Sequence, residues 1–104
     1  MTTFDDRLKS FEAKYAHDAE MQFRAEARRN KIMGLWAAGL MGHTGDDAVA
    51  YAQEVIRADF QEPGDEDVIR KLAADLDGHA TEDEIRAKLA ESLAQAKAEI
   101  MSEG

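Results

Sequence analysis

Hydrophobic residues recur every three or four positions along most of this chain, which is the spacing of one face of an α-helix. The first such pattern begins at Thr3 and runs to about Met41, and it divides near residue 18 into an N-terminal segment (1–18) and a second part. The pattern then predicts helices at about residues 19–41, 46–60, 65–77 and 82–102. Ala, Leu and Met dominate the apolar residues, which favours helices over strands.

Turn and capping residues separate the predicted helices, at Gly42–Gly45, Glu62–Asp65, Gly78 and Thr81–Glu84. Thr81 and Glu84 have the spacing of a capping box, in which each side chain accepts a hydrogen bond from the other residue's backbone. Thr44 is placed to cap its helix in a similar way. Because short connections favour antiparallel neighbours, the sequence predicts an all-α fold, a small four-helix bundle with a long N-terminal helix.

The apolar face of the first pattern changes direction along the helix. An N-terminal stripe consists of Phe4, Leu8, Phe11 and Tyr15. A second stripe lies about 100° further around the helix and consists of Ala16, Ala19, Phe23 and Ala27. A bend near Lys14–Asp18 or a core that wraps around the helix explains this rotation. So does an N-terminal stripe that faces a separate partner, in which case residues 1–16 project from the bundle or are mobile, and the core begins at Phe23.

Composition limits the classes of function. Residues 1–33 hold seven Lys/Arg and six Asp/Glu, whereas residues 34–104 hold six and sixteen, so most of the chain would repel phosphate. This distribution argues against a nucleic-acid partner. The chain has no cysteine and no apolar stretch long enough to span a bilayer. We therefore expect a cytoplasmic protein without direct membrane insertion.

A basic face on the first pattern is a candidate ligand site. Arg24, Arg28 and Lys31 lie one turn apart, with Glu20 one turn before Arg24. Such a face is typical of solvated ion pairs, and it is also a possible contact for phosphate or carboxylate groups. It therefore supports a nucleotide- or ligand-sensing bundle as an alternative function, although no glycine-rich loop accompanies it.

Metal and catalytic sites have weaker support. Four residues, Asp75, Asp77, Gly78 and Glu84, partly imitate a calcium loop, but a glycine cap followed by a capping box accounts for all of them. His17 and Glu20 have the spacing of half a di-metal site, without matching carboxylates. No serine, histidine and acid are arranged for nucleophilic catalysis, and we expect all three serines to lie on the surface. We expect neither a metal nor an enzyme.

Three segments of the sequence resemble a known family. The chain resembles the zeta subunit of alphaproteobacterial F-type ATP synthases, most clearly at Thr3–Ala16, Arg28-Arg29-Asn30-Lys31 and Leu35–Gly42. The resemblance covers the whole chain. The resemblance implies a four-helix bundle whose N-terminal segment inhibits ATP hydrolysis. That segment enters the interface between the alpha and beta subunits near the gamma shaft.

The resemblance also implies particular residues and partners. The N-terminal stripe fills the interface, with Asp5, Arg7 and Glu12 as flanking polar contacts. The partners are the alpha, beta and gamma subunits of the catalytic head, which places the protein at the inner membrane through the complex. A weak contact with ADP or ATP, on the face of Arg24, Arg28 and Lys31, is a secondary expectation, and no other cofactor is expected.

Overall fold

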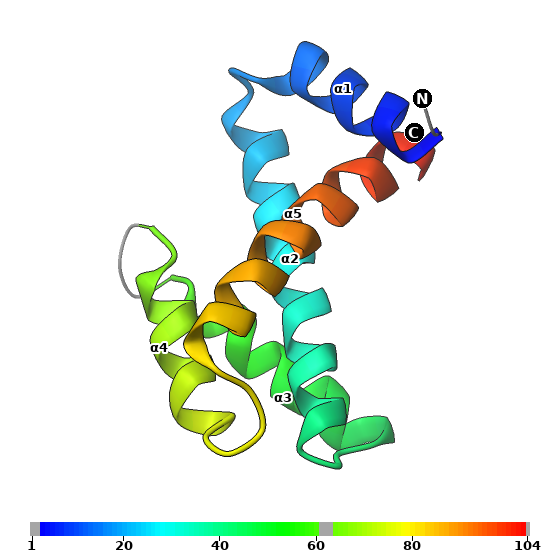
Figure 1. Cartoon of the computed structure of the whole chain (residues 1–104). Coiled ribbons are helices and arrows are strands. Elements are labelled where there is room, and N and C mark those ends of the chain that lie inside the picture. The colour runs from blue at the N-terminus through cyan, green and yellow to red at the C-terminus, as the bar shows by residue number, and fades with distance from the viewer. Residues whose placement is uncertain (1–2, 61–63, 104) are drawn as a thin grey trace.

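Five helices make up the regular structure of the described part of the chain (Figure 1). A computed structural model describes residues 3–60 and 64–103. The helices are α1 Thr3–Tyr15, α2 Ala19–Leu40, α3 Gly45–Ala58, α4 Glu66–Asp75 and α5 Glu82–Glu103. The all-α prediction is confirmed, and the last four helices begin and end within two residues of their predicted bounds. Over the described residues, no helix is long and apolar enough to cross a membrane.

The predicted long N-terminal helix is instead two helices that meet at an angle (Figure 1). The break falls at Ala16–Asp18, where the second apolar stripe was expected to begin. Asp18 has an extended backbone, and its carboxylate accepts a hydrogen bond from the Met21 N–H at 3.1 Å. This bond caps the free end of α2, so a separate helix begins here.

The other predicted caps have mixed outcomes. Thr81 Oγ1 accepts from the Glu84 N–H at 3.1 Å and Glu84 Oε1 accepts from the Thr81 N–H at 3.0 Å, which confirms the capping box. Gly78 has a φ of +85°, as expected of a residue that follows a helix. Thr44 is the N-cap residue of α3, as predicted, but its side chain does not make the expected capping hydrogen bond. Part of the predicted turn Glu62–Asp65 lies outside the described residues.

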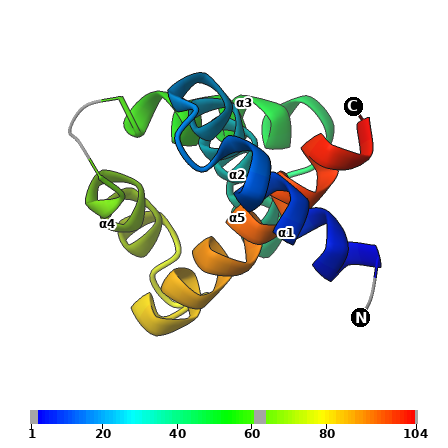
Figure 2. The ribbon, with the colours of Figure 1, turned by 90° about the horizontal axis from the view of Figure 1, so that it is seen from above.

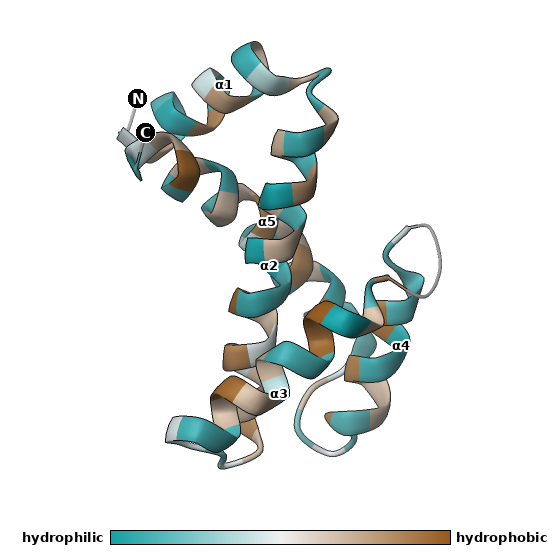
Figure 3. Cartoon of the chain, turned by 180° about the vertical axis from the view of Figure 1, so that it is seen from behind, coloured by the Kyte–Doolittle hydropathy of each residue, from teal (hydrophilic) through white to brown (hydrophobic). Residues whose placement is uncertain are grey.

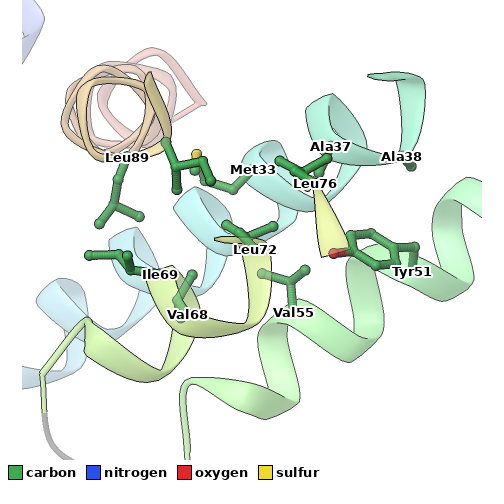
Figure 4. Close-up of a cluster of buried hydrophobic side chains, with 11 residues drawn as sticks. Met33, Ala37, Ala38, Tyr51, Val55, Val68, Ile69, Leu72, Leu76 and Leu89 are labelled. Atoms are coloured by element: carbon green, nitrogen blue, oxygen red, sulfur yellow. The ribbon is translucent and has the colours of Figure 1, made fainter. Parts of the chain in front are cut away.

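The hydrophobic core lies where α2, α3, α4 and the first half of α5 meet (Figure 4). Its members are Met33, Ala37, Ala38, Tyr51, Val55, Val68, Ile69, Leu72, Leu76, Ile85 and Leu89. None of them comes from α1, whose ribbon in Figure 3 is mostly hydrophilic with a few apolar positions. This core therefore forms among α2, α3, α4 and α5, which are together called the bundle below, with α1 outside it.

The buried face of α2 differs from the prediction. Ala16, Ala19 and Phe23 of the second stripe are exposed, and 51% of the surface of Phe23 is accessible. The core therefore does not begin at Phe23. The buried positions of α2 are instead Ala25, Arg29, Asn30, Met33, Gly34, Ala37 and Ala38. This stripe includes an arginine and an asparagine, which a search for apolar residues passes over.

Glycine allows α2 and α3 to approach closely. A Cβ atom on Gly34 would lie 2.5 Å from the Cα of Ala52, closer than real contacts permit. Around Gly39, in the same helix, nothing lies within 4 Å of the same added atom. Only Gly34 is therefore needed for packing between these helices.

We expect alanine to have opposite effects on stability at the two glycines. Gly34→Ala should destabilise the protein by about 1–3 kcal/mol, because the backbones of α2 and α3 must separate. Gly39→Ala should stabilise it by about 0.5–1 kcal/mol, because alanine favours the helix and fits the open space. Urea unfolding of both variants measures the two changes, and equal effects would contradict the close approach.

Candidate functional site

The N-terminal stripe occupies one side of α1, and its members are buried to different degrees. Phe11 is fully buried, Leu8 and Tyr15 are half-buried, and Phe4 is 42% exposed. The rings of Phe11 and Tyr15 pack edge to face, with centroids 5.2 Å apart. The stripe is therefore a single apolar surface that is covered at its centre and open toward its N-terminal end.

The cover is the second half of α5, against which α1 packs and which it crosses in the view of Figure 2. Ile85, Leu89 and Ala96 of α5 are buried on one face of the helix. Ala98 lies more than 120° around the helix from Ile85 and is only 5% exposed. Its burial fits a second contact on the far face of α5, made by α1.

One lysine of α5 contacts both a charged and an aromatic residue of α1. Lys97 pairs with the Glu12 carboxylate, and its Nζ lies 5.6 Å from the centre of the Phe11 ring. The Lys97 side chain is 12% exposed, so its methylene stem is covered as well. Burial of a phenylalanine side chain contributes about 2–3 kcal/mol, whereas a partly exposed ion pair contributes about 1 kcal/mol at most. Phe11 therefore supplies most of the docking free energy.

This docking corrects the expectation that the N-terminal stripe has no partner within the chain. Phe11 is covered by the protein itself, so α1 does not project freely. Glu12, predicted as a flanking contact, is paired with Lys97. The other two predicted flanking residues, Asp5 and Arg7, are exposed.

The link between α1 and α2 is short and hydrogen-bonded. The Tyr15 carbonyl accepts from the Asp18 N–H at 3.1 Å and from the Gln22 side-chain amide at 2.8 Å. Residues Ala16–Asp18 contain neither glycine nor proline. Three non-helical residues therefore connect a docked helix to the bundle.

The predicted basic face of α2 is engaged in ion pairs. Arg24 pairs with Glu20 at 3.4 Å. Arg28 donates to Glu103 at 2.8 Å and lies 3.5 Å from Glu99, which joins α2 to the last turns of α5. The hydrogen bond from Arg28 holds the pKa of Glu103 below its usual value.

A pocket of about 580 Å³ lies beside this face, between α1, α2 and the end of α5. Its lining residues are Tyr15, Met21, Phe23, Arg24, Ala27, Arg28, Ile100 and Glu103. Arg24 and Arg28 are thus brought together here, while Lys31, the third predicted residue, is exposed and does not line the pocket. An anion in this pocket would have to displace carboxylates that already hold the arginines.

The residues of the weaker candidates have structural roles. Asp75 accepts hydrogen bonds from Tyr51 and Lys71, and Glu84 caps α5. Two of the four residues that partly imitate a calcium loop therefore stabilise the fold. Within residues 3–60 and 64–103, no group of three or more potential metal ligands is found. The prediction that all serines are exposed is wrong, because Ser92 is fully buried and its Oγ lies 3.4 Å from the Met33 sulfur.

Two important residues were not identified from the sequence. Lys97 lies among alanines and glutamates of α5, and no local pattern indicates its contact with residues 85 positions earlier. Arg29 is only 1% exposed and donates to Asp65 at 2.9 Å. A signal for Arg29 existed, because it stands four residues after Ala25 and four before Met33 on the buried stripe.

Comparisons with known proteins agree with the sequence resemblance. A family model described as ATPase inhibitor subunit zeta matches residues 1–99. Among solved structures, a chain determined by solution NMR shares 58% sequence identity with this one and superposes with a TM-score of 0.76. That match covers 81% of this chain and 99% of the other. No curated protein matches the sequence.

The docking of α1 predicts a difference between two phenylalanines of one stripe. Phe11→Ala should lower the melting temperature by about 5 °C or more, because a fully buried ring is removed. The loss is limited to the docking free energy of α1, since the bundle core contains no residue of this helix. Phe4→Ala should lower the melting temperature by much less, because Phe4 is already 42% exposed. Thermal melts followed by circular dichroism measure both, and a Phe11→Ala melt equal to that of the parent would contradict the docked position.

Proposed function

The chain belongs to the ATPase inhibitor subunit zeta family, and we propose that it blocks ATP hydrolysis and reverse rotation by inserting α1 between the alpha and beta subunits, near the gamma shaft. Membership of this family supports a regulatory role on the ATP synthase rather than a catalytic one. The observation that carries the proposed mechanism is that α1 contributes no residue to the hydrophobic core cluster. It is an amphipathic helix outside the core, joined to the bundle by three residues.

The position of α1 outside the core supports insertion, because α1 can detach from α5 without unfolding the bundle. The core residues come from α2, α3, α4 and α5. A helix that lays an apolar stripe into a groove is a common mode of recognition between proteins. The polar flanks, Asp5, Arg7 and Glu12, then lie at the edges of that groove, where they set orientation.

Charge also favours α1 as the inserting part. Thr3–Tyr15 carries three Lys/Arg and three Asp/Glu, whereas residues 34–104 are strongly acidic. Burial of net charge in an interface is unfavourable, so a helix without net charge enters more readily than the acidic bundle. Such a wedge needs no chemistry, because it stops rotation by binding one rotational state better than the next.

The bundle then remains outside the interface, attached through Ala16–Asp18. The proposed location follows from the partner, at the cytoplasmic side of the inner membrane and within the ATP synthase complex. A nucleotide sensor, with ADP or ATP on Arg24, Arg28 and Lys31, is the alternative. The pocket beside Arg24 and Arg28 favours it, and their ion pairs with Glu20 and Glu103 weigh against it. The inhibitor is therefore the better-supported function.

Removal of the N-terminal segment tests the proposed function. A protein that begins at residue 17 should remain folded, because the core and the Asp18 cap are retained. It should also lose inhibition of the ATPase, because the inserted stripe is absent. ATP hydrolysis by an alphaproteobacterial enzyme is measured against the concentration of each protein, with circular dichroism as the folding control. Full inhibition by the shortened protein would move the site to the bundle.

A second variant tests the stripe without disturbing the docked helix. Phe4 is 42% exposed, so Phe4→Ala should retain stability yet raise the half-inhibitory concentration about thirtyfold, the loss expected of an interface anchor worth about 2 kcal/mol. Ser10→Ala is the matched control, since Ser10 is exposed on α1 away from the stripe, and it should inhibit like the parent. Equal inhibition by both variants would remove Phe4 from the interface.

A further inference from the structure

The surface that α1 is proposed to offer to the ATP synthase is covered in the free protein. Phe11, at the centre of the stripe, has no accessible surface because α1 packs on the second half of α5. A side chain cannot be buried in two grooves at once. Binding to α5 and binding to another subunit through this stripe are therefore mutually exclusive.

Lys97 holds the covered state through two contacts. Its ammonium group pairs with Glu12 and lies 5.6 Å from the centre of the Phe11 ring. A cation over an aromatic ring is attracted to the face of the ring, and more strongly where water is excluded. The exposed fraction of the Lys97 side chain is 12%, so both contacts are partly shielded from solvent.

The structure around the link allows α1 to be released. Asp18 caps α2 through a bond within α2's own first turn, so this cap does not depend on the position of α1. The bonds that α1 would lose at the link are those of the Tyr15 carbonyl with the Asp18 N–H and the Gln22 amide. Both involve a chain segment that becomes accessible to water on release, so water can replace them.

We propose that the docking of α1 on α5 is an autoinhibitory latch, and that Lys97 is one of the residues that hold it closed. This inference rests on the proposed function, because it assumes that α1 is the inserting helix. Only the open form can bind the ATP synthase, so the apparent affinity is the intrinsic affinity multiplied by the open fraction. A weaker latch therefore makes a stronger and faster inhibitor.

Lys97→Met is the test variant, because methionine keeps an unbranched apolar stem and removes the charge. Lys88→Met is the matched control on the same helix. Lys88 also pairs with a glutamate, Glu91 at 3.1 Å, and its Nζ lies 6.0 Å from the centre of the Trp36 ring, but it lies two to three turns from Lys97. The two lysines thus make the same kinds of contact, with α1 involved in one of them only.

Two measurements are made on the full-length proteins. Hydrogen exchange of the α1 amides reports opening of the latch, and the rate at which ATP hydrolysis declines after mixing reports binding to the ATPase. We expect Lys97→Met to speed both the exchange and the onset of inhibition by about three- to tenfold, in proportion to the open fraction. Lys88→Met should leave both rates unchanged.

The other outcomes overturn the proposal in distinguishable ways. Unchanged α1 exchange in Lys97→Met means that Lys97 does not hold the helix. Faster exchange with an unchanged or slower onset of inhibition means that docking does not limit binding, while the proposed function survives. If the parent protein does not inhibit at all, the proposed function fails, and the latch fails with it.

Discussion

The close packing of α2 against α3 determines where the other helices can lie. Gly34 brings the two backbones so near at Ala52 that no side chain fits between them. Val68 and Leu72 of α4, with Leu76 directly after this helix, pack in the core beside residues of α2 and α3 (Figure 4). Because α3 occupies one side of α2, α5 packs along another, where Ser92 meets Met33 and Arg28 meets Glu103.

A buried arginine reinforces the same arrangement. Arg29 donates to Asn30 at 3.1 Å and to Asp65 at 2.9 Å, and Asn30 donates to Asp59 at 2.9 Å. A guanidinium group is costly to bury unless its donors are paired, so Asp59 and Asp65 must stay close to α2. These two aspartates lie at the end of α3 and just before α4, on either side of residues 61–63. The ion pairs thus hold the end of α3 and the residue before α4 close to α2.

The N-terminal helix is held by different means, and this difference relates structure to the proposed function. Many buried apolar side chains hold the bundle together, whereas Phe11 is the one buried residue of α1. A helix that buries one side chain has a lower free energy of local opening than the core helices, which is a common property of segments that bind partners. The same stripe therefore serves two purposes, protection from solvent in the free protein and recognition in the proposed complex. Its proposed inhibitory strength depends on the balance between them.

Local chemistry made much of the fold predictable from the sequence. The bounds of the last four helices, the capping box at Thr81–Glu84 and the left-handed Gly78 depend on neighbours within a few residues, and these predictions agree with the structure, the bounds to within two residues. The family was also recognisable, from segments in α1 and α2. Periodicity also identified Phe4, Leu8, Phe11 and Tyr15 as one face of a helix.

Only the tertiary structure decided which faces are covered. Phe23 was predicted in the core and is exposed, whereas Arg29 is buried, because α2 contacts three helices and more than one of its faces is covered. Likewise, the sequence showed that α1 has an apolar stripe, but the partner of that stripe in the free protein is α5, more than 80 residues away. Periodicity reports which residues share a side of a helix. What lies against that side depends on the directions in which the connections send the other helices, and no local pattern contains that information.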